Sequence, residues 1–203
     1  MSPRSSQSNQ KIRDERHDQI LQAALKVFAY KGFQAAKIAD IAAQAGISQG
    51  LIHHYFTSKE QVFTAVVEHA MNGALAAFDA AAGSTPWDHL TLITERMLQG
   101  LANHPEYMLV LTQSLVSQDT PPEAGKFLAA LSQQVNASLV ELIRSGQAAG
   151  QVVAGSAEEL AVLYLAVMQG LAITQFTQGM FLQAAPSPAP LPSPAAVLRL
   201  LKA

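Results

Sequence analysis

The chain has 203 residues, no cysteine and a formal net charge of −2. A chain without cysteine has no disulfide scaffold, thiolate nucleophile, iron–sulfur cluster or cysteine-based zinc site. Hydrophobic residues make up 49% of the sequence and charged residues only 14%, so we expect a substantial buried core and little disorder.

The charge is unevenly distributed along the chain. Residues 1–59 contain eight basic and four acidic residues, a net charge of +4, whereas residues 60–203 contain five basic and eleven acidic residues, a net charge of −6. This asymmetry is typical of a nucleic-acid-binding segment attached to an acidic body, although an excess of four charges can also arise by chance. No stretch resembles a signal peptide, and the longest apolar run, Leu160–Met168, is too short to span a membrane. We therefore expect a cytoplasmic protein.

Apolar residues recur at helical spacing through most of the chain, and runs of β-branched residues are scarce. Proline at first helical positions and capping-box patterns beginning at Ser58, Thr120 and Ser156 mark helix starts, while Gly32 and Gly150 are typical of helix ends. The sequence predicts an all-α fold of about nine helices, at residues 12–30, 38–44, 49–55, 59–82, 86–102, 105–118, 121–149, 157–180 and 194–202.

Two segments fall outside the helical pattern. We expect residues 1–10 to form a disordered arm. Proline alternates with other residues through residues 184–193, which excludes a helix there and favours a stiff, extended linker before the last helix. A ligand for an SH3 domain is the alternative interpretation of this proline-rich segment.

The most informative segment is KGFQAAKIADIAAQAGISQGLIHHYFTSK, residues 31–59. It predicts two short helices joined by a tight turn at Ala45–Ser48, an arrangement typical of a helix-turn-helix motif, whose second helix enters the major groove of DNA. Gly46 can adopt the backbone conformation of the turn, and Ser48 can cap the second helix. The residues expected to form the core of this unit are Phe28, Phe33, Ile41, Ile47, Ile52 and Phe56.

This segment resembles the DNA-binding domain of the TetR/AcrR family of transcriptional regulators. The family pattern is a glycine–aromatic pair followed by D-I-A-x-x-A-G-(V/I)-S-x-G-x-(L/I)-Y-x-Y-F-x-S-K-E. The chain matches it in register at Gly32-Phe33, Asp40-Ile41-Ala42, Ala45-Gly46-Ile47-Ser48, Gly50, Ile52, Tyr55-Phe56 and Ser58-Lys59-Glu60. The match covers about residues 15–68. Beyond it, only the layout of the helices and the phrase SGQAAGQVV, residues 145–153, resemble the family.

The resemblance implies a set of DNA contacts in and around the motif. Gln49, Gly50 and Leu51 lie where the family reads base edges, and a glutamine side chain can bond an adenine edge in two places. His53, Tyr55 and Lys59 lie at positions that contact phosphates. The complete set that we expect is Lys37, Ser48, Gln49, Gly50, Leu51, His53, His54, Tyr55 and Lys59.

The chain departs from the family pattern at three positions. Ala36 and Lys37 stand where the family has hydroxyl residues, so the second helix lacks a cap whose loss costs about 1 kcal/mol. We expect Lys37 to replace the hydroxyl with a charged phosphate contact. His53 replaces a tyrosine, and we expect a neutral hydrogen bond to phosphate there, with a mild pH dependence of DNA binding as the alternative.

The resemblance further implies that residues 11–58 form the DNA-binding domain, residues 59–82 a connecting helix and residues 83–203 a helical ligand-binding and dimerisation domain. The candidate ligand-contacting residues, for which core packing is the alternative, are Met97, Tyr107, Met108, Gln113, Phe127, Tyr164, Met168, Gln169 and Phe176. Few charges occur among these helices, which favours an uncharged or lipophilic ligand. The residues that could form a homodimer interface, or equally an internal core, are Leu160, Leu163, Val167, Leu171, Leu198 and Leu201.

We interpret the chain as a ligand-responsive, DNA-binding transcriptional regulator, and as a repressor rather than an activator. It is expected to bind a palindromic DNA operator as a homodimer and to release it when a small molecule binds. The alternative is a helical small-molecule carrier or sensor that acts through protein partners. We expect no catalysis, cofactor or metal site, because HExxH, GxSxG and phosphate-binding glycine loops are missing, and because the adjacent His53 and His54 would point in different directions on a helix.

Overall fold

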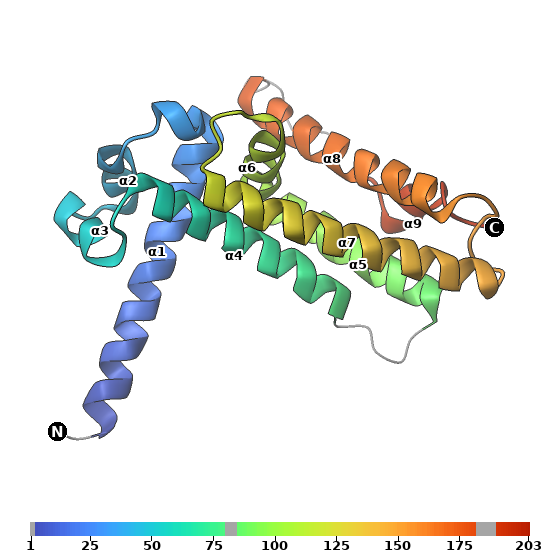
Figure 1. Cartoon of the computed structure of the whole chain (residues 1–203), viewed down its shortest axis with the longest axis horizontal. Coiled ribbons are helices and arrows are strands. Elements are labelled where there is room, and N and C mark those ends of the chain that lie inside the picture. Colours follow the sequence, from blue (N-terminus) through green and yellow to red (C-terminus); the bar gives the residue numbers. More distant parts are fainter. Residues whose placement is uncertain (1–2, 80–84, 182–189) are drawn as a thin grey trace.

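A computed structural model describes residues 3–79, 85–181 and 190–203 (Figure 1). Across these residues the regular structure is α-helical, with one isolated β-bridge between Val152 and Lys202 and no strand. The helices in chain order are α1 (Pro3–Ala35), α2 (Ile38–Ala45), α3 (Gln49–Tyr55), α4 (Lys59–Asp79), α5 (Pro86–Asn103), α6 (Pro105–Val116), α7 (Pro122–Ala148), α8 (Ala157–Phe181) and α9 (Pro194–Leu198). The predicted all-α class and the order of the helices are confirmed.

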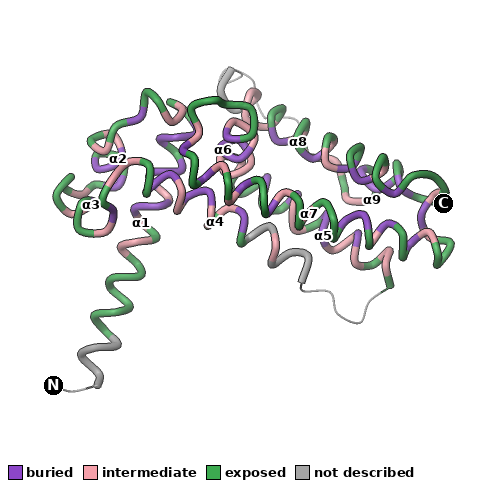
Figure 2. Tube along the Cα trace, viewed as in Figure 1, coloured by how far each residue is buried: buried purple, intermediate pink, exposed green. Residues whose placement is uncertain are grey.

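The helices form an elongated molecule (Figure 1). Helices α1–α3, which we call the head, lie at one end, and the carboxyl terminus lies at the other. Helices α4–α9, which we call the body, extend along the long axis, with α4 and α7 packed against each other. The first turns of α1 project from the head away from the body, and from residue 8 onward they are exposed (Figure 2).

Helix α1 begins earlier than the sequence predicts. Residues 3–10, expected to be a disordered arm, continue the helix that is packed into the head further along the chain. Extending an existing helix avoids the cost of nucleation. Side-chain pairs at i, i+4 support the extension. The amide of Gln10 donates to the carboxylate of Asp14 at 2.8 Å, and the ammonium of Lys11 lies 3.8 Å from the carboxylate of Glu15.

The hydroxyl half of the predicted capping box forms at two of the three helix starts, and the side chain of Gln61 accepts the N–H of Thr57 rather than that of Ser58. The hydroxyls of Ser58 and Ser156 each accept a backbone N–H at 3.2 Å, three residues into the helix. The prediction is wrong at Thr120, whose hydroxyl instead donates to the carbonyl of Ser114 at 2.9 Å. The predicted interruption at Gly32 is present, with φ 72° and ψ 167°.

One buried core is shared by the head and the body. Phe28, Ile41 and Ile52 of the head belong to the same cluster as Phe63 of α4 and Leu128 of α7. The six residues predicted to form the core of the head are all buried or half-buried in this cluster. Because apolar packing continues from one part to the other, a rotation of the head has to alter the packing of the body.

A second core lies further along the body, among α5, α7, α8 and α9. Its buried members include Ile143 of α7, Met168 of α8 and Leu198 of α9. The hydroxyls of Thr94 and Tyr164 are 2.9 Å apart inside it, so the polar atom of each is paired. Burial raises the pKa of Tyr164, whereas its hydrogen bond with Thr94 lowers it.

The last helix is shorter than the predicted 194–202. Ser193 caps α9 by accepting the N–H of Ala196 at 3.2 Å, and beyond Leu198 the chain forms turns and the bridge to Val152. This bridge fixes the carboxyl-terminal segment to the α7–α8 connection. Most of the predicted proline-rich linker lies outside the described residues, and residues 190–193 have no helical structure.

Candidate DNA-binding site

The turn between α2 and α3 has the geometry that the sequence predicts. Ile41 and Ala42 on α2 and Ile52 on α3 are buried, so the two helices are packed against the rest of the head. Gly46 is left-handed, with φ 66° and ψ 33°, and ends α2 with its N–H directed at the last carbonyls. Ser48 then caps α3 by accepting the N–H of Leu51 at 3.2 Å. Local interactions therefore set where α3 begins.

The N-terminal end of α3 presents its residues to the solvent. Gln49, Gly50 and His53 are exposed, and Leu51 is half-buried. A Cβ atom added to Gly50 would meet only the Ser48 hydroxyl oxygen, at 3.9 Å. The fold itself therefore does not require glycine here, which is consistent with a close approach by another molecule.

The second half of α3 is partly structural. Tyr55 packs against the core of the head, with the ring of the exposed His54 at 5.6 Å in an edge-on contact. His17 of α1 stacks on Phe56 at 5.2 Å and so holds the end of α3 against α1. A phosphate contact by Tyr55 is thus restricted to the hydroxyl end of its ring.

The start of α2 is stabilised by Asp40 instead of a capping hydroxyl. Its carboxylate accepts the backbone N–H of Lys37 at 3.0 Å and forms an ion pair with Lys31 at 2.8 Å. These contacts, the hydrogen bond from Lys31 first, lower the pKa of Asp40. The Lys37 side chain is exposed, and within the described residues its ammonium has no hydrogen bond or ion pair. The Lys37 ammonium is therefore accessible from solvent, and its contact with a phosphate stays a prediction.

The structure corrects the expected role of Lys59. Its ammonium donates to the carbonyls of Phe33 at 2.8 Å, Gln34 at 3.2 Å and Ala36 at 3.0 Å, and lies 4.4 Å from the centre of the Phe33 ring. An ammonium has three protons, and all three are engaged. Lys59 therefore joins the end of α1 to the start of α4, and a phosphate could bind it only by displacing these carbonyls. The partners lie 23 to 26 residues away, so no local sequence signal indicates this role.

The nine predicted ligand-contacting residues do not share one cavity. Met97, Tyr164 and Met168 lie in the second core. Another group packs partly buried against the first core: Tyr107, Phe127 and Phe176. Met108 is half-buried, whereas Gln169 is exposed on α8, so the prediction that Gln169 lines an internal pocket is wrong for the single chain.

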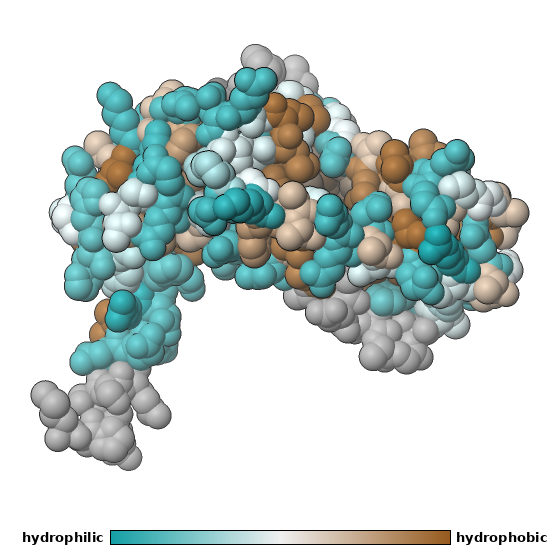
Figure 3. Space-filling view, viewed as in Figure 1, coloured by the Kyte–Doolittle hydropathy of each residue, from teal (hydrophilic) through white to brown (hydrophobic). Residues whose placement is uncertain are grey.

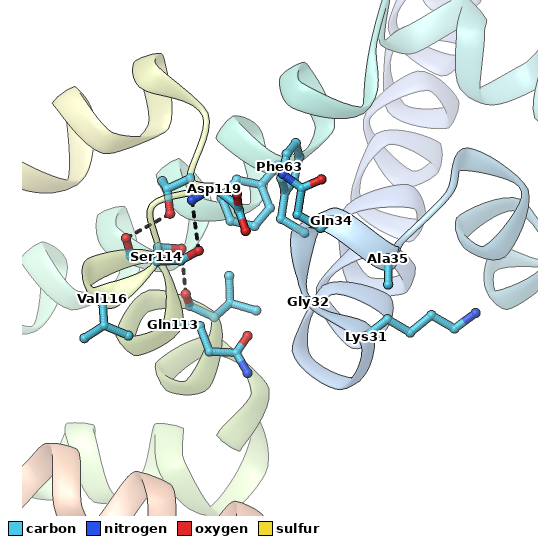
Figure 4. Close-up of a pocket in the computed structure, with 13 residues that line it drawn as sticks. Lys31, Gly32, Gln34, Ala35, Phe63, Gln113, Ser114, Val116 and Asp119 are labelled. Atoms are coloured by element: carbon cyan, nitrogen blue, oxygen red, sulfur yellow. Dashed lines mark hydrogen bonds between the residues drawn. The ribbon is translucent and has the colours of Figure 1, made fainter.

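Among the predicted residues, Gln113 lines a cavity formed by described residues. This cavity has a volume of about 330 Å³ and lies where the end of α1 faces α6 and the connection to α7. Figure 4 shows Lys31, Gly32, Gln34 and Ala35 on one side of it, and Gln113, Ser114, Val116 and Asp119 on the other. A second cavity, of about 390 Å³, separates Gln22 and Lys26 of α1 from the α5–α6 connection. Both cavities lie between the head and the body, where a ligand would contact both.

The predicted dimer stripes divide into exposed and buried residues. Leu198 and Leu201 are 1% and 0% exposed inside the second core, so the internal alternative applies to them and the interface prediction is wrong. Leu160, Val167 and Leu171 are half-buried against the same core. Leu163 is 54% exposed, together with Val162 at 62% and Ile173 at 44%.

These residues give α8 one apolar face that the described part of the chain does not cover. Over residues 157–178, α8 is apolar and long enough to cross a membrane by composition alone, and only 22% of that segment is buried. Its other side contributes Ala161, Tyr164 and Met168 to the second core. Apolar areas are visible among the polar atoms over the body in Figure 3. An exposed apolar face on a core helix is typical of a protein–protein contact.

Comparison with known proteins agrees with the motif. The family model described as bacterial regulatory proteins, tetR family, matches residues 20–66. The chain is 31% identical over 143 residues to the HTH-type transcriptional repressor NicS of Pseudomonas putida. The matched region covers 68% of this chain and 66% of NicS. It is 30% identical over 152 residues to the HTH-type transcriptional regulator EthR of Mycolicibacterium smegmatis, which covers 73% of this chain and 69% of EthR.

Solved structures share the whole fold. The MbdR regulator from Azoarcus sp. CIB superimposes with a TM-score of 0.76 at 24% identity, covering 92% of this chain and 97% of that one. The ketosteroid transcriptional regulator KstR2 of Mycobacterium tuberculosis gives a TM-score of 0.67 at 18% identity, covering 93% and 95%. At these identities the likeness concerns the arrangement of helices and not the ligands.

Proposed function

Because the chain belongs to the TetR family of bacterial regulatory proteins, we propose that it is a cytoplasmic transcriptional repressor. It binds a palindromic DNA operator as a homodimer and releases it when a small molecule binds. The observation that carries this proposal is the exposed N-terminal end of α3, positioned by Gly46 and Ser48. Two relatives are named as repressors, NicS of Pseudomonas putida and KstR2 of Mycolicibacterium smegmatis, and they support repression over activation.

Within the site, each exposed residue has a distinct proposed task. Gln49 and Leu51 contact base edges, and Gly50 allows the backbone of α3 to approach the DNA. Lys37 and His53 bind phosphates. Lys37 is exposed directly before the start of α2, and His53 is exposed on α3. Ser48 acts mainly as the cap of α3, and Lys59 holds the end of α1.

The proposed effector acts through the contacts between head and body. Gln22 of α1 donates to the Tyr107 hydroxyl of α6 at 2.7 Å, and Gln113 of α6 reaches the carbonyl of Ala29 at 3.5 Å. A ligand that displaces Gln113 from the adjoining cavity changes one of these contacts. It favours release only if it binds the released arrangement more tightly than the DNA-bound one. An uncharged or lipophilic molecule suits the largely apolar body helices.

The proposed dimer forms through the apolar face of α8. Val162, Leu163 and Ile173 lie on this face with the exposed small residues Ala166 and Gly170 between them. Small residues let two helices approach closely, and a second copy of the same face would remove the apolar side chains from water. A two-fold dimer presents two α3 helices, which explains why the operator should be palindromic.

The proposal is tested by selecting duplexes from a random DNA library with the full-length chain. The selected sequence is then titrated by fluorescence anisotropy at several salt concentrations. We expect a palindromic sequence, sequence-dependent affinity and a steep fall of affinity with salt. Gln49→Ala should change the preferred bases, whereas Lys37→Ala should weaken binding to all sequences and reduce the salt slope by about one unit per subunit. Weak binding without sequence preference would contradict the proposal and favour a small-molecule carrier.

A further inference from the structure

The N-terminal part of α1 extends beyond the helix-turn-helix unit. Residues 3–16, which we call the arm helix, project from the head at the end of the molecule that carries α2 and α3 (Figure 1). From residue 8 to residue 15 every position is exposed, so none of the residues that the structure describes covers this segment (Figure 2). At 1.5 Å per residue the arm helix is about 20 Å long.

The charges of the arm helix are divided between two faces. Arg13 and Arg16 fall at i and i+3 relative to Ile20 at i+7, and residues at this spacing share one face of a helix. Ile20 is fully buried in the core that contains Ile41 of α2 and Ile52 of α3. The face that carries both arginines is therefore the face that turns toward the helix-turn-helix unit.

The opposite face is acidic and turns toward the body. Glu15, Asp18 and Gln22 follow the same i, i+3, i+7 spacing. Gln22 bonds to Tyr107 of α6, and the charge of Asp18 acts on the Tyr107 hydroxyl. Lys11, on this side, is paired with Glu15 at 3.8 Å. Glu15 and Asp18 thus lie away from the helix-turn-helix unit, whereas Asp14 lies between the two faces and accepts a hydrogen bond from Gln10.

The two arginines are placed to act beside the motif. Arg16 donates to the side-chain oxygen of Gln19 at 2.5 Å, and Gln19 donates to the carbonyl of Ala45 at 2.7 Å, directly before the turn into α3. Arg13 lies one turn further out, exposed, and its guanidinium has no hydrogen bond or ion pair within the described part of the chain. One arginine is thus tied to the motif and the other faces solvent beyond it.

We propose that the arginine face of the arm helix, Arg13 and Arg16, binds phosphates of the DNA backbone flanking the base pairs that α3 reads. Guanidinium groups bind phosphates in a forked geometry and hold their charge at any physiological pH. An arm about 20 Å long can reach about six base pairs beyond the motif at 3.4 Å per base pair. Contacts to phosphates carry no sequence information, so the arm raises affinity and leaves the preferred bases unchanged. This inference rests on the DNA binding proposed above.

The test compares Arg13→Gln with Lys11→Gln in the full-length chain. Each variant removes one positive charge from an exposed position of the same helix, but only Arg13 lies on the arginine face. Affinity for the selected operator with flanks of about ten base pairs is measured by anisotropy across a range of salt. We expect Arg13→Gln to reduce the salt slope by about 0.9 per arm, which is about an eightfold loss of affinity per arm at 0.1 M salt. Lys11→Gln should leave the slope nearly unchanged.

The duplex supplies a second, independent readout. On a duplex trimmed to the base pairs read by the two α3 helices, the difference between Arg13→Gln and the unchanged chain should disappear. Circular dichroism checks that the helix content is the same in both variants. Equal effects of the two substitutions, or no change of slope with Arg13→Gln, would overturn the proposal while leaving operator binding intact. If the unchanged chain binds DNA weakly and without salt dependence, the proposed function itself fails.

Discussion

Replacing Lys59 by methionine removes an ammonium that holds three backbone carbonyls at the end of α1, but keeps a flexible apolar stem. A hydrogen bond to a charged group contributes about 1.5–3 kcal/mol when buried. Two of the three bonds are partly buried and one is exposed, so full additivity does not apply. The contact with the Phe33 ring, 4.4 Å away, adds about 0.5–1 kcal/mol. We expect a loss of roughly 2–4 kcal/mol in the free energy of unfolding, a large share of a typical domain's stability.

The measurement is urea unfolding at a fixed protein concentration, because a dimer's stability depends on concentration. Lys37→Met is the matched control, since Lys37 is exposed and within the described residues makes no side-chain bond. We expect the control to unfold like the unchanged chain but to lose salt-dependent affinity for DNA. Lys59→Met should show the reverse pattern, with a salt slope close to normal under conditions where it is folded. If Lys59→Met kept its stability and lost about one unit of salt slope per subunit, the structural role of Lys59 would be refuted.

Three further predictions concern the rest of the molecule. A Cβ atom at Gly146 would lie 2.5 Å from the Cγ2 of Val152, so Gly146→Ala should cost about 1–3 kcal/mol in urea unfolding; Gly100→Ala, with no neighbour within 4 Å on an exposed helix face, should instead stabilise by about 0.5–1 kcal/mol. Because hydrogen bonds lower the pKa of Asp40 in the folded chain, its contribution is present above about pH 4 and is lost as the pH falls through that lowered pKa. Asp40→Asn should therefore flatten the acid limb of the stability curve below about pH 4, and an unchanged acid limb would contradict this assignment. Leu163→Asp, on the exposed face of α8, should give a folded monomer in sedimentation velocity, whereas an intact dimer would place the interface elsewhere.

The sequence predicts the helix-turn-helix unit well because its geometry depends on short-range interactions. The N–H of Gly46 donates to the carbonyl of Ala43, three residues back, and the hydroxyl of Ser48 accepts the N–H of Leu51, three residues ahead. The sequence also predicts a cap at Thr120, but this cap does not form, because the Thr120 hydroxyl donates to the carbonyl of Ser114 on α6 instead. A local pattern therefore identifies a possible hydrogen bond, while competing partners brought by the fold decide which one forms.

The extended α1 shows a different limit of sequence patterns. Residues 3–10 are polar and lack the apolar spacing that marks a helix against a core. They are helical because they continue a helix that is already anchored in the head, which removes the nucleation cost. The division of charge between Arg13 and Glu15 could be read from the spacing, but which face turns toward the motif becomes clear only from the burial of Ile20.

The sequence by itself determined the all-α class, the position of the reading helix and the family to which its motif is similar, because these depend on periodicity and on contacts within a few residues. The tertiary structure decided which surfaces are covered. Leu163 and Leu198 belong to similar apolar stripes, yet Leu163 is exposed on α8 and Leu198 is buried in the second core. Lys59 is basic and starts a helix, yet its ammonium donates a hydrogen bond to the carbonyl of Phe33 at the end of α1. The physical reason is the same in each case. A sequence pattern shows that a side chain is apolar or charged, but packing between distant segments decides which groups it contacts.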